Sequence, residues 1–266
     1  MGDVSIGFLG GGRMASALMR GLLREREPGS IGVYDPVLRP GEPWLGTACR
    51  VFASPAELFA ASRWLVWAIK PQVFHAEAAA WRALRFSGTG WISIMAGVRL
   101  ARLEALAGNV PVVRAMPNLP LMLGAGAVAL APGRHAGGPH LEEARRLFAP
   151  VGEVLVVDEK AMDGVTALSG SGPAYLFYLA EVVDREAHGL GLTPEAARKL
   201  WAQTLLGSAR MLAAPGAEPA ELRRQVTSPG GTTQAALEEL ERRGFAAAFA
   251  AGLAAARDRS VVLSGS

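Results

Sequence analysis

The stretch Val4-Ser5-Ile6-Gly7-Phe8-Leu9-Gly10-Gly11-Gly12-Arg13-Met14-Ala15 decides the fold of this chain. Its first six residues have the apolar character of a short buried strand. They run into a G-x-G-x-x-A pattern that opens an amphipathic segment, which is the context of a dinucleotide-binding fingerprint. There Gly10 allows the tight turn, Gly12 the approach of a pyrophosphate, and Ala15 close packing of helix on strand. The stretch therefore predicts a nucleotide site, with a simple glycine turn as the alternative.

A second strand is expected at residues 31–35, and it ends on Asp35, twenty residues after Ala15. An acidic side chain at this place accepts hydrogen bonds from the adenosine ribose of NAD. Arg39, four residues further on, could instead face the 2′-phosphate of NADP. The two residues favour opposite cofactors, and either could simply be a solvated loop charge.

Strands continue to alternate with helices through the first half of the chain. Further strands are expected at residues 64–69, 90–97, 110–114, 127–130 and 152–157, and helices at 55–61, 76–84, 100–107 and 141–148. This alternation is typical of a parallel, doubly wound sheet. We therefore predict an α/β Rossmann domain with a mainly parallel sheet over residues 1–158.

The strand at 64–69 is closed by Lys70 and Pro71. Since proline cannot continue a central ladder, the chain should leave the sheet there, at the carboxyl edge where open α/β sheets bind ligands. Lys70 is either a cofactor contact or a solvated strand-end lysine. Arg114 and Asn118 stand in a proline-rich turn and are interpreted as turn structure rather than catalytic groups.

Beyond Asp158 the strand pattern stops, and residues 159–266 predict an all-helical second domain. Within it, Thr227-Ser228-Pro229-Gly230-Gly231-Thr232-Thr233 separates two helical segments. Glycines, hydroxyls and a helix N-terminus make such a turn a natural anion site. The alternative is an ordinary helix start, with Ser228 as the cap and Pro229 at the first helical position.

The composition excludes several classes of protein. The 266 residues carry a formal charge of only +3, with dispersed arginines and without a basic block, so we expect no nucleic-acid partner. One cysteine and four scattered histidines predict neither a disulfide nor a metal site. We see neither a long apolar run nor a signal peptide, so the expectation is a cytoplasmic protein without a membrane span.

Several motifs together resemble those of the pyrroline-5-carboxylate reductase family. They lie at residues 10–15, 68–72, 93–98, 114–118, 162–175 and 227–233, within a resemblance that runs from about Ile6 to Arg257. The motifs at 162–175 and 227–233 are highly specific, whereas the glycine fingerprint is not. The chain departs from the family at Arg13, where asparagine is common, and at Gly164, where alanine is common.

The resemblance implies a Rossmann domain, a helical dimerisation domain, and homodimers that assemble into larger rings. It also implies reduction of a small-molecule cyclic imine to L-proline by NADPH or NADH. By position, Thr233 is the catalytic hydroxyl near the substrate ring nitrogen. The substrate carboxylate is assigned to Ser228 and to the backbone amides of Gly230, Gly231 and Thr232. The cofactor is assigned to Gly10, Gly12, Arg13, Met14, Ala15, Asp35, Ala68, Lys70 and Pro71.

Two other readings of the same architecture stay open at this point. A β-hydroxyacid or another imine reductase would share the fold but act on a different substrate, and the first of these would need a catalytic lysine in the helical domain. A cofactor-sensing protein without catalysis would be expected to lack the Thr233 or Gly10 motif. Both motifs are intact.

Overall fold

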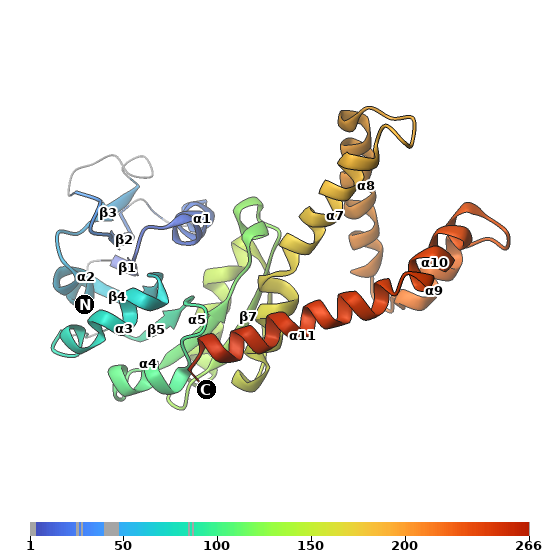
Figure 1. Ribbon diagram of the computed structural model, residues 1–266. Coiled ribbons are helices and arrows are strands. Elements are labelled where there is room, and N and C mark those ends of the chain that lie inside the picture. Colours follow the sequence, from blue (N-terminus) through green and yellow to red (C-terminus); the bar gives the residue numbers. More distant parts are fainter. Residues whose placement is uncertain are drawn as a thin grey trace. The chain divides into compact units, whose positions relative to one another are not determined.

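The computed structural model describes residues 4–24, 27, 29–39, 48–84, 86 and 88–265. The chain forms two compact units, shown in Figure 1. The sheet unit comprises Met1–Ser171 together with Ala256–Ser266, and the helical unit comprises Gly172–Ala255. The last helix begins in the helical unit and ends in the sheet unit.

The sheet unit is built on one eight-stranded sheet with the order β3-β2-β1-β4-β5-β6-β7-β8. Its strands are β1 (Val4–Leu9), β2 (Ile31–Tyr34), β3 (Cys49–Val51), β4 (Ser62–Trp67), β5 (Gly90–Ser93), β6 (Val112–Met116), β7 (Gly126–Pro132) and β8 (Gly152–Val156). Because β1 lies between β2 and β4, the strand order reverses beside β1. Open α/β sheets bind dinucleotides at such a switch point.

The strands from β3 to β6 pair in parallel, which confirms the predicted Rossmann class. The expectation of parallel strands fails at β7, which is antiparallel to β6, with Ala115 opposite Leu130. The strands β7 and β8 are parallel to each other. The sequence also missed β3, because three residues at a sheet edge are too few to show a period.

Helices cover both faces of this sheet. They are α1 (Arg13–Leu22), α2 (Pro55–Ala61), α3 (Pro71–Trp81), α4 (Leu100–Ala107), α5 (Gly138–Phe148) and the short α6 (Met162–Val165). The buried cluster on one face draws on α1 and α5, and that on the other face draws on α2, α3 and α4. The second cluster is strongly aromatic, with Trp67 packed edge-on against Phe59 and Phe74.

The chain passes from α6 into the helical unit through an almost continuous helical segment. Residues Thr166–Gly170 form a π-helical turn, and α7 (Gly172–Glu186) starts two residues later. The side-chain hydroxyls of Thr166 and Ser169 donate to the carbonyls of Met162 and Val165, one turn back. Hydroxyls that bond the carbonyl four residues back often bend a helix, and here they accompany the π-helical turn.

The helical unit contains α7, α8 (Pro194–Leu212), α9 (Pro219–Gln225), α10 (Thr232–Arg242) and the first part of α11 (Phe245–Leu263). The helix α8 begins after an N-cap at Thr193, whose hydroxyl accepts from the Ala196 amide at 3.2 Å. Gly244, with φ +73°, lies between α10 and α11.

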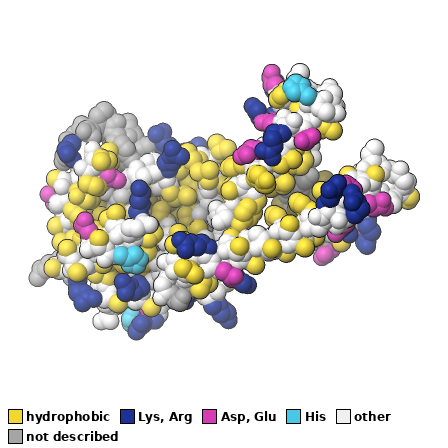
Figure 2. Space-filling view, viewed as in Figure 1, with side chains coloured by type: hydrophobic (Ala, Val, Ile, Leu, Met, Phe, Trp, Pro, Cys, Tyr) yellow, Lys and Arg dark blue, Asp and Glu magenta, His cyan; other side chains and the backbone are white. Residues whose placement is uncertain are grey.

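The helical unit has almost no core of its own. Of residues 172–255, all of which the structure describes, only Ala187 and Ala197 are buried. Large apolar side chains are instead exposed, and Figure 2 shows hydrophobic groups gathered along these helices. Exposed patches of this extent mark an interaction surface.

No helix among the described residues is long and apolar enough to cross a membrane.

Candidate active site

The glycine-rich loop lies where the end of β1 meets its two neighbouring strands. The Gly10 amide donates to the Tyr34 carbonyl at the end of β2, and the Ala68 amide after β4 donates to the Leu9 carbonyl. Gly10 has φ +105°, and a Cβ there would lie 2.7 Å from the Ala68 carbonyl oxygen. The position therefore requires glycine both for its backbone conformation and for the close approach.

Gly12 differs from Gly10 in that a Cβ there would meet nothing within 4 Å. It is the N-cap of α1, and its carbonyl accepts the first intrahelical bond, from Ser16. The amides of Arg13, Met14 and Ala15 therefore have no acceptor within the helix. Open space in front of free amides at a helix N-terminus fits a pyrophosphate, and this observation supports the assignment of a dinucleotide to the loop.

Asp35 is held at the same edge of the sheet. One carboxylate oxygen accepts from the Gly11 amide at 2.9 Å, and the other accepts from the Val37 amide at 3.1 Å. The side chain of Arg39 donates to the carbonyls of Pro36 and Leu38. Of the two competing cofactor-reading residues, the structure therefore joins Asp35 to the glycine loop and folds Arg39 onto its own segment.

The remaining predicted cofactor residues follow β4. Ala68 faces Gly10, Lys70 is the exposed N-cap of α3, and Pro71 is the first residue of that helix. The strand ends at Trp67, two residues earlier than expected, and the chain enters α3 at Pro71.

The turn before α10 is compact and bonded within itself. The Gly231 amide donates to the Ser228 carbonyl at 3.0 Å, which closes a four-residue turn with Pro229 and Gly230 in the middle. Gly230 has φ +71°, the conformation that the third position of a type II turn requires. A Cβ on Gly231 would lie 2.4 Å from the Ser228 hydroxyl oxygen, so glycine is needed where that hydroxyl is packed.

Gln234 is a residue of this turn that the sequence interpretation missed. Its side-chain oxygen accepts from the Gly230 amide at 2.7 Å. Gln at the third position of a helix is a known capping signature, and that signal could have found it. Because the Ala235 amide donates to the Gly231 carbonyl, the amides of Thr232 and Thr233 come before the first intrahelical bond.

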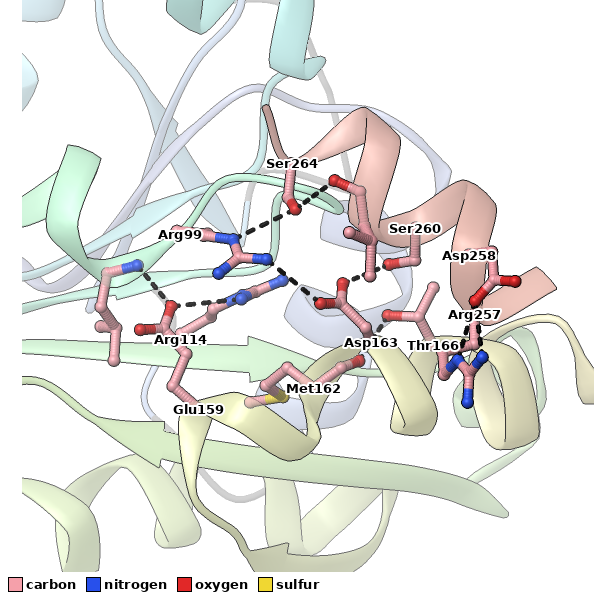
Figure 3. A network of polar contacts seen from close by, with 12 residues as sticks. Arg99, Arg114, Glu159, Met162, Asp163, Thr166, Arg257, Asp258, Ser260 and Ser264 are labelled. Carbon is pink, nitrogen blue, oxygen red and sulfur yellow. Dashed lines mark hydrogen bonds and ion pairs between the residues drawn. The ribbon is translucent and has the colours of Figure 1, made fainter. Parts of the chain in front are cut away.

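A buried polar network involves residues of β6, α6 and the end of α11 (Figure 3). Arg114 is 2% exposed and pairs with Glu159 at 3.2 Å. Burial lowers the pKa of the Arg114 guanidinium, and the Glu159 carboxylate opposes this shift. Asp163 accepts from Arg99 at 3.4 Å and from the Ser260 hydroxyl at 2.6 Å, which ties the end of α11 to α6.

The turn interpretation is wrong for Arg114, which lies within β6 opposite Ser93 and Ala131, whereas Asn118 lies in the turn after that strand. Asn118 donates to the Ser169 carbonyl at 3.1 Å and accepts from the Ala127 amide at 2.9 Å. Both side chains therefore have structural partners.

The sheet order, the open glycine loop and the acid at the end of β2 define a class of protein, an NAD(P)-dependent oxidoreductase with a Rossmann domain. Residues 159–263 match the family model described as pyrroline-5-carboxylate reductase dimerisation. Residues 5–97 match the model described as NADP oxidoreductase, coenzyme F420-dependent.

Full-length relatives agree with these matches. The chain is 40% identical to a pyrroline-5-carboxylate reductase of Pseudomonas aeruginosa, across 99% of this chain and 98% of that protein. It is 39% identical to one of Methanosarcina acetivorans, across 98% of both. The chain therefore belongs to the pyrroline-5-carboxylate reductase family and is an NAD(P)H-dependent oxidoreductase.

Two solved structures show the same fold over nearly the whole chain. A pyrroline-5-carboxylate reductase of Coxiella burnetii superimposes with a TM-score of 0.89 at 32% identity, covering 98% of this chain and 99% of that chain. A pyrroline carboxylate reductase of Plasmodium falciparum, with NADP bound, gives a TM-score of 0.88 at 26% identity, covering 99% of each chain.

Proposed function

We propose that this protein reduces the C=N bond of 1-pyrroline-5-carboxylate to L-proline, the last step of proline biosynthesis, with NADPH or NADH. The observation that carries the proposal is the turn from Ser228 to Thr233, a small-residue anion site beside a hydroxyl, on a chain whose first strand ends in a dinucleotide loop. The substrate needs both an anion site for its carboxylate and a hydrogen-bonding group at its ring nitrogen.

When bound, NAD(P)H supplies the hydride. Gly10, Gly12 and the free amides at the start of α1, those of Arg13, Met14 and Ala15, hold the pyrophosphate. Asp35 contacts the adenosine ribose, and its two backbone hydrogen bonds fix the carboxylate for that role. Ala68, Lys70 and Pro71 form the adjoining edge of the site.

The turn orients the substrate through its carboxylate. The Ser228 hydroxyl and the Thr232 amide donate to this anion, while Gly230 and Gly231 give the turn its shape. Hydrogen bonds to a charged acceptor are shorter and about twice as strong as neutral ones, and the helix dipole of α10 adds to them. Carboxylate binding thereby fixes the ring in one pose, which is how positioning lowers a barrier.

Thr233 supplies the hydroxyl near the ring nitrogen. A C=N bond accepts hydride more readily when its nitrogen is protonated, but a threonine hydroxyl is too weak an acid to provide that proton. Thr233 therefore orients the ring by a hydrogen bond, and the proton comes with the substrate or through water.

The helical unit supports a proposal about assembly. Its exposed side chains include Phe177 at 56% and Leu200 at 59%. A groove of about 450 Å³ between α7 and α11 is lined by Tyr175, Tyr178 and Phe249, among others. We propose homodimers joined through this surface that assemble into a ring of dimers. Light scattering tests this assembly.

We further propose that residues 1–158 form the cofactor-binding domain and residues 159–266 the substrate-binding and dimerisation domain. The site of action is proposed to be the cytoplasm. Cell fractionation with an antibody against the protein tests the location.

The decisive experiment follows oxidation of NADPH and of NADH, separately, with racemic 1-pyrroline-5-carboxylate. Proline is identified as product by chiral chromatography. We expect turnover that yields L-proline only. A folded protein that binds cofactor but reduces nothing would show that the substrate has been misassigned.

A further inference from the structure

Gln234 links the proposed carboxylate site to the first turns of α10. It is half-buried, and its side-chain oxygen accepts from the Gly230 amide at 2.7 Å. Its side-chain nitrogen donates to a Glu238 carboxylate oxygen, also at 2.7 Å. The Gln234 side chain is therefore held from both ends and cannot rotate freely.

These contacts settle which amides of the turn stay available. The Gly230 amide donates to Gln234 and the Gly231 amide to the Ser228 carbonyl, which corrects the expectation that these two amides hold the substrate carboxylate. The turn thus keeps its shape through its own bonds, including the left-handed Gly230 at φ +71°. Ligand donors are left at the Ser228 hydroxyl and the Thr232 and Thr233 amides.

We propose that Gln234 is a positioning residue for substrate binding: it holds the turn in the form that accepts the carboxylate before the substrate arrives. The proposal rests on the proposed function of the turn. Without the Gln234 acceptor, the Gly230 amide must find water, and glycine in this turn regains its wide conformational freedom. The substrate would then have to order the turn on binding, and that cost weakens affinity.

The neutral amide suits this role better than a carboxylate. Glutamate at 234 would keep an acceptor for Gly230 but would place a negative charge beside an anion site and opposite Glu238. Like charges at i and i+4 of a helix repel each other, and the added charge also opposes the substrate carboxylate.

The test compares Gln234→Met with a matched control, Gln225→Met, in the full-length protein. Methionine keeps the length and helix preference of glutamine but removes the strong acceptor. Gln225 is exposed on α9, and its side chain contacts Glu221. We expect Gln234→Met to raise KM for 1-pyrroline-5-carboxylate by about 3- to 10-fold, with kcat within about twofold. KM for NADPH should stay unchanged in Gln234→Met. The control variant Gln225→Met should keep the wild-type KM for both substrates.

Binding without turnover provides a second readout. The affinities of L-proline and of prolinamide, which lacks the carboxylate, are measured by calorimetry in both proteins. Gln234→Met should weaken proline but not prolinamide, so the preference for the carboxylate shrinks. Equal weakening of both ligands, or an unchanged KM, would overturn the proposal. If Gln234→Met does not fold, Gln234→Ala decides, because it also removes the acceptor of the Gly230 amide: a raised KM with an unchanged kcat supports the role, and a wild-type KM rejects it.

The outcomes distinguish a failure of the role proposed for Gln234 from a failure of the proposed function. A wild-type protein that does not reduce 1-pyrroline-5-carboxylate would refute the proposed function. An active wild-type protein whose Gln234→Met variant has wild-type KM would refute only the role of Gln234.

Discussion

The substitution Glu159→Ala is expected to destabilise the protein strongly, because Glu159 is the partner of a buried cation. Its Oε1 accepts from the Arg114 guanidinium at 3.2 Å and from the Leu100 amide at the start of α4 at 2.6 Å. Alanine leaves Arg114, which is 2% exposed, without this partner. It also leaves the Leu100 amide, the first amide of α4, without an acceptor among the described side chains.

The magnitude follows from these two losses. Removing one member of a buried ion pair costs about 3–5 kcal/mol, and losing a helix cap costs about 1 kcal/mol. Water reaches the Glu159 side chain, which is 30% exposed, and Asp163 also raises the pKa of Arg114. We therefore expect a total loss near 3 kcal/mol, or a fall in Tm of roughly 6–12 °C for a chain of this size.

A double-mutant cycle isolates the buried charge as the cause. Arg114→Met removes the cation and leaves Glu159 bonded to Leu100, so it should cost only about 1 kcal/mol. Adding Arg114→Met to Glu159→Ala should recover about 2 kcal/mol. Glu142→Ala is the matched control, because Glu142 pairs with Arg146 on the surface of α5, where an ion pair contributes about 0–1 kcal/mol.

The assay is thermal and urea unfolding at one fixed protein concentration, since dissociation of an oligomer contributes to the measured stability. Additive costs in the double mutant would refute the reasoning, as would a Glu159→Ala variant as stable as the Glu142→Ala control.

Three further predictions concern the two ligand sites. Asp35→Asn should raise the ratio of kcat/KM with NADPH to kcat/KM with NADH by about tenfold. The substitution removes a negative charge that repels the 2′-phosphate of NADPH and binds the ribose of NADH. Arg39→Ala, measured alongside, should leave this ratio unchanged. Gly10→Ala should abolish cofactor binding in calorimetry, since its Cβ would lie 2.7 Å from the Ala68 oxygen. Thr233→Ala should lower kcat by about 10- to 100-fold with an unchanged circular dichroism spectrum, and Thr233→Ser should restore most of it; wild-type kinetics for the alanine variant would remove Thr233 from the mechanism.

Much of the fold could be read from local sequence signals. The helices at 55–61 and 100–107 were expected with the bounds that the structure has, because Pro55 begins the first and Gly108 follows the second. The glycine fingerprint predicted β1, the loop that follows it and α1 together. The direction of β7 could not be read, because a strand between two loops has the same apolar pattern whichever way it runs.

The residues of the candidate sites, like the fold, could be predicted only in part. Gly10, Asp35 and Ala68 could be grouped from the sequence because parallel strands bring their carboxyl ends to one edge, and the contacts at that edge agree. The partners of Arg114 could not be foreseen. Glu159 is 45 residues away from it along the chain, and the pair meets only because α4, β6 and the segment after β8 converge there.

Both ligand loops share one structural feature. In each loop an amide is occupied by a side chain of the protein itself: Asp35 accepts from Gly11, and Gln234 accepts from Gly230. A glycine-rich loop loses much conformational entropy when it is ordered, so such an internal acceptor offsets part of the cost before a ligand binds. Glycine supplies the conformations that these loops need, and the acceptor selects one of them. Asp35 and Gln234 should therefore govern affinity more than turnover, while Thr233 should govern turnover more than affinity.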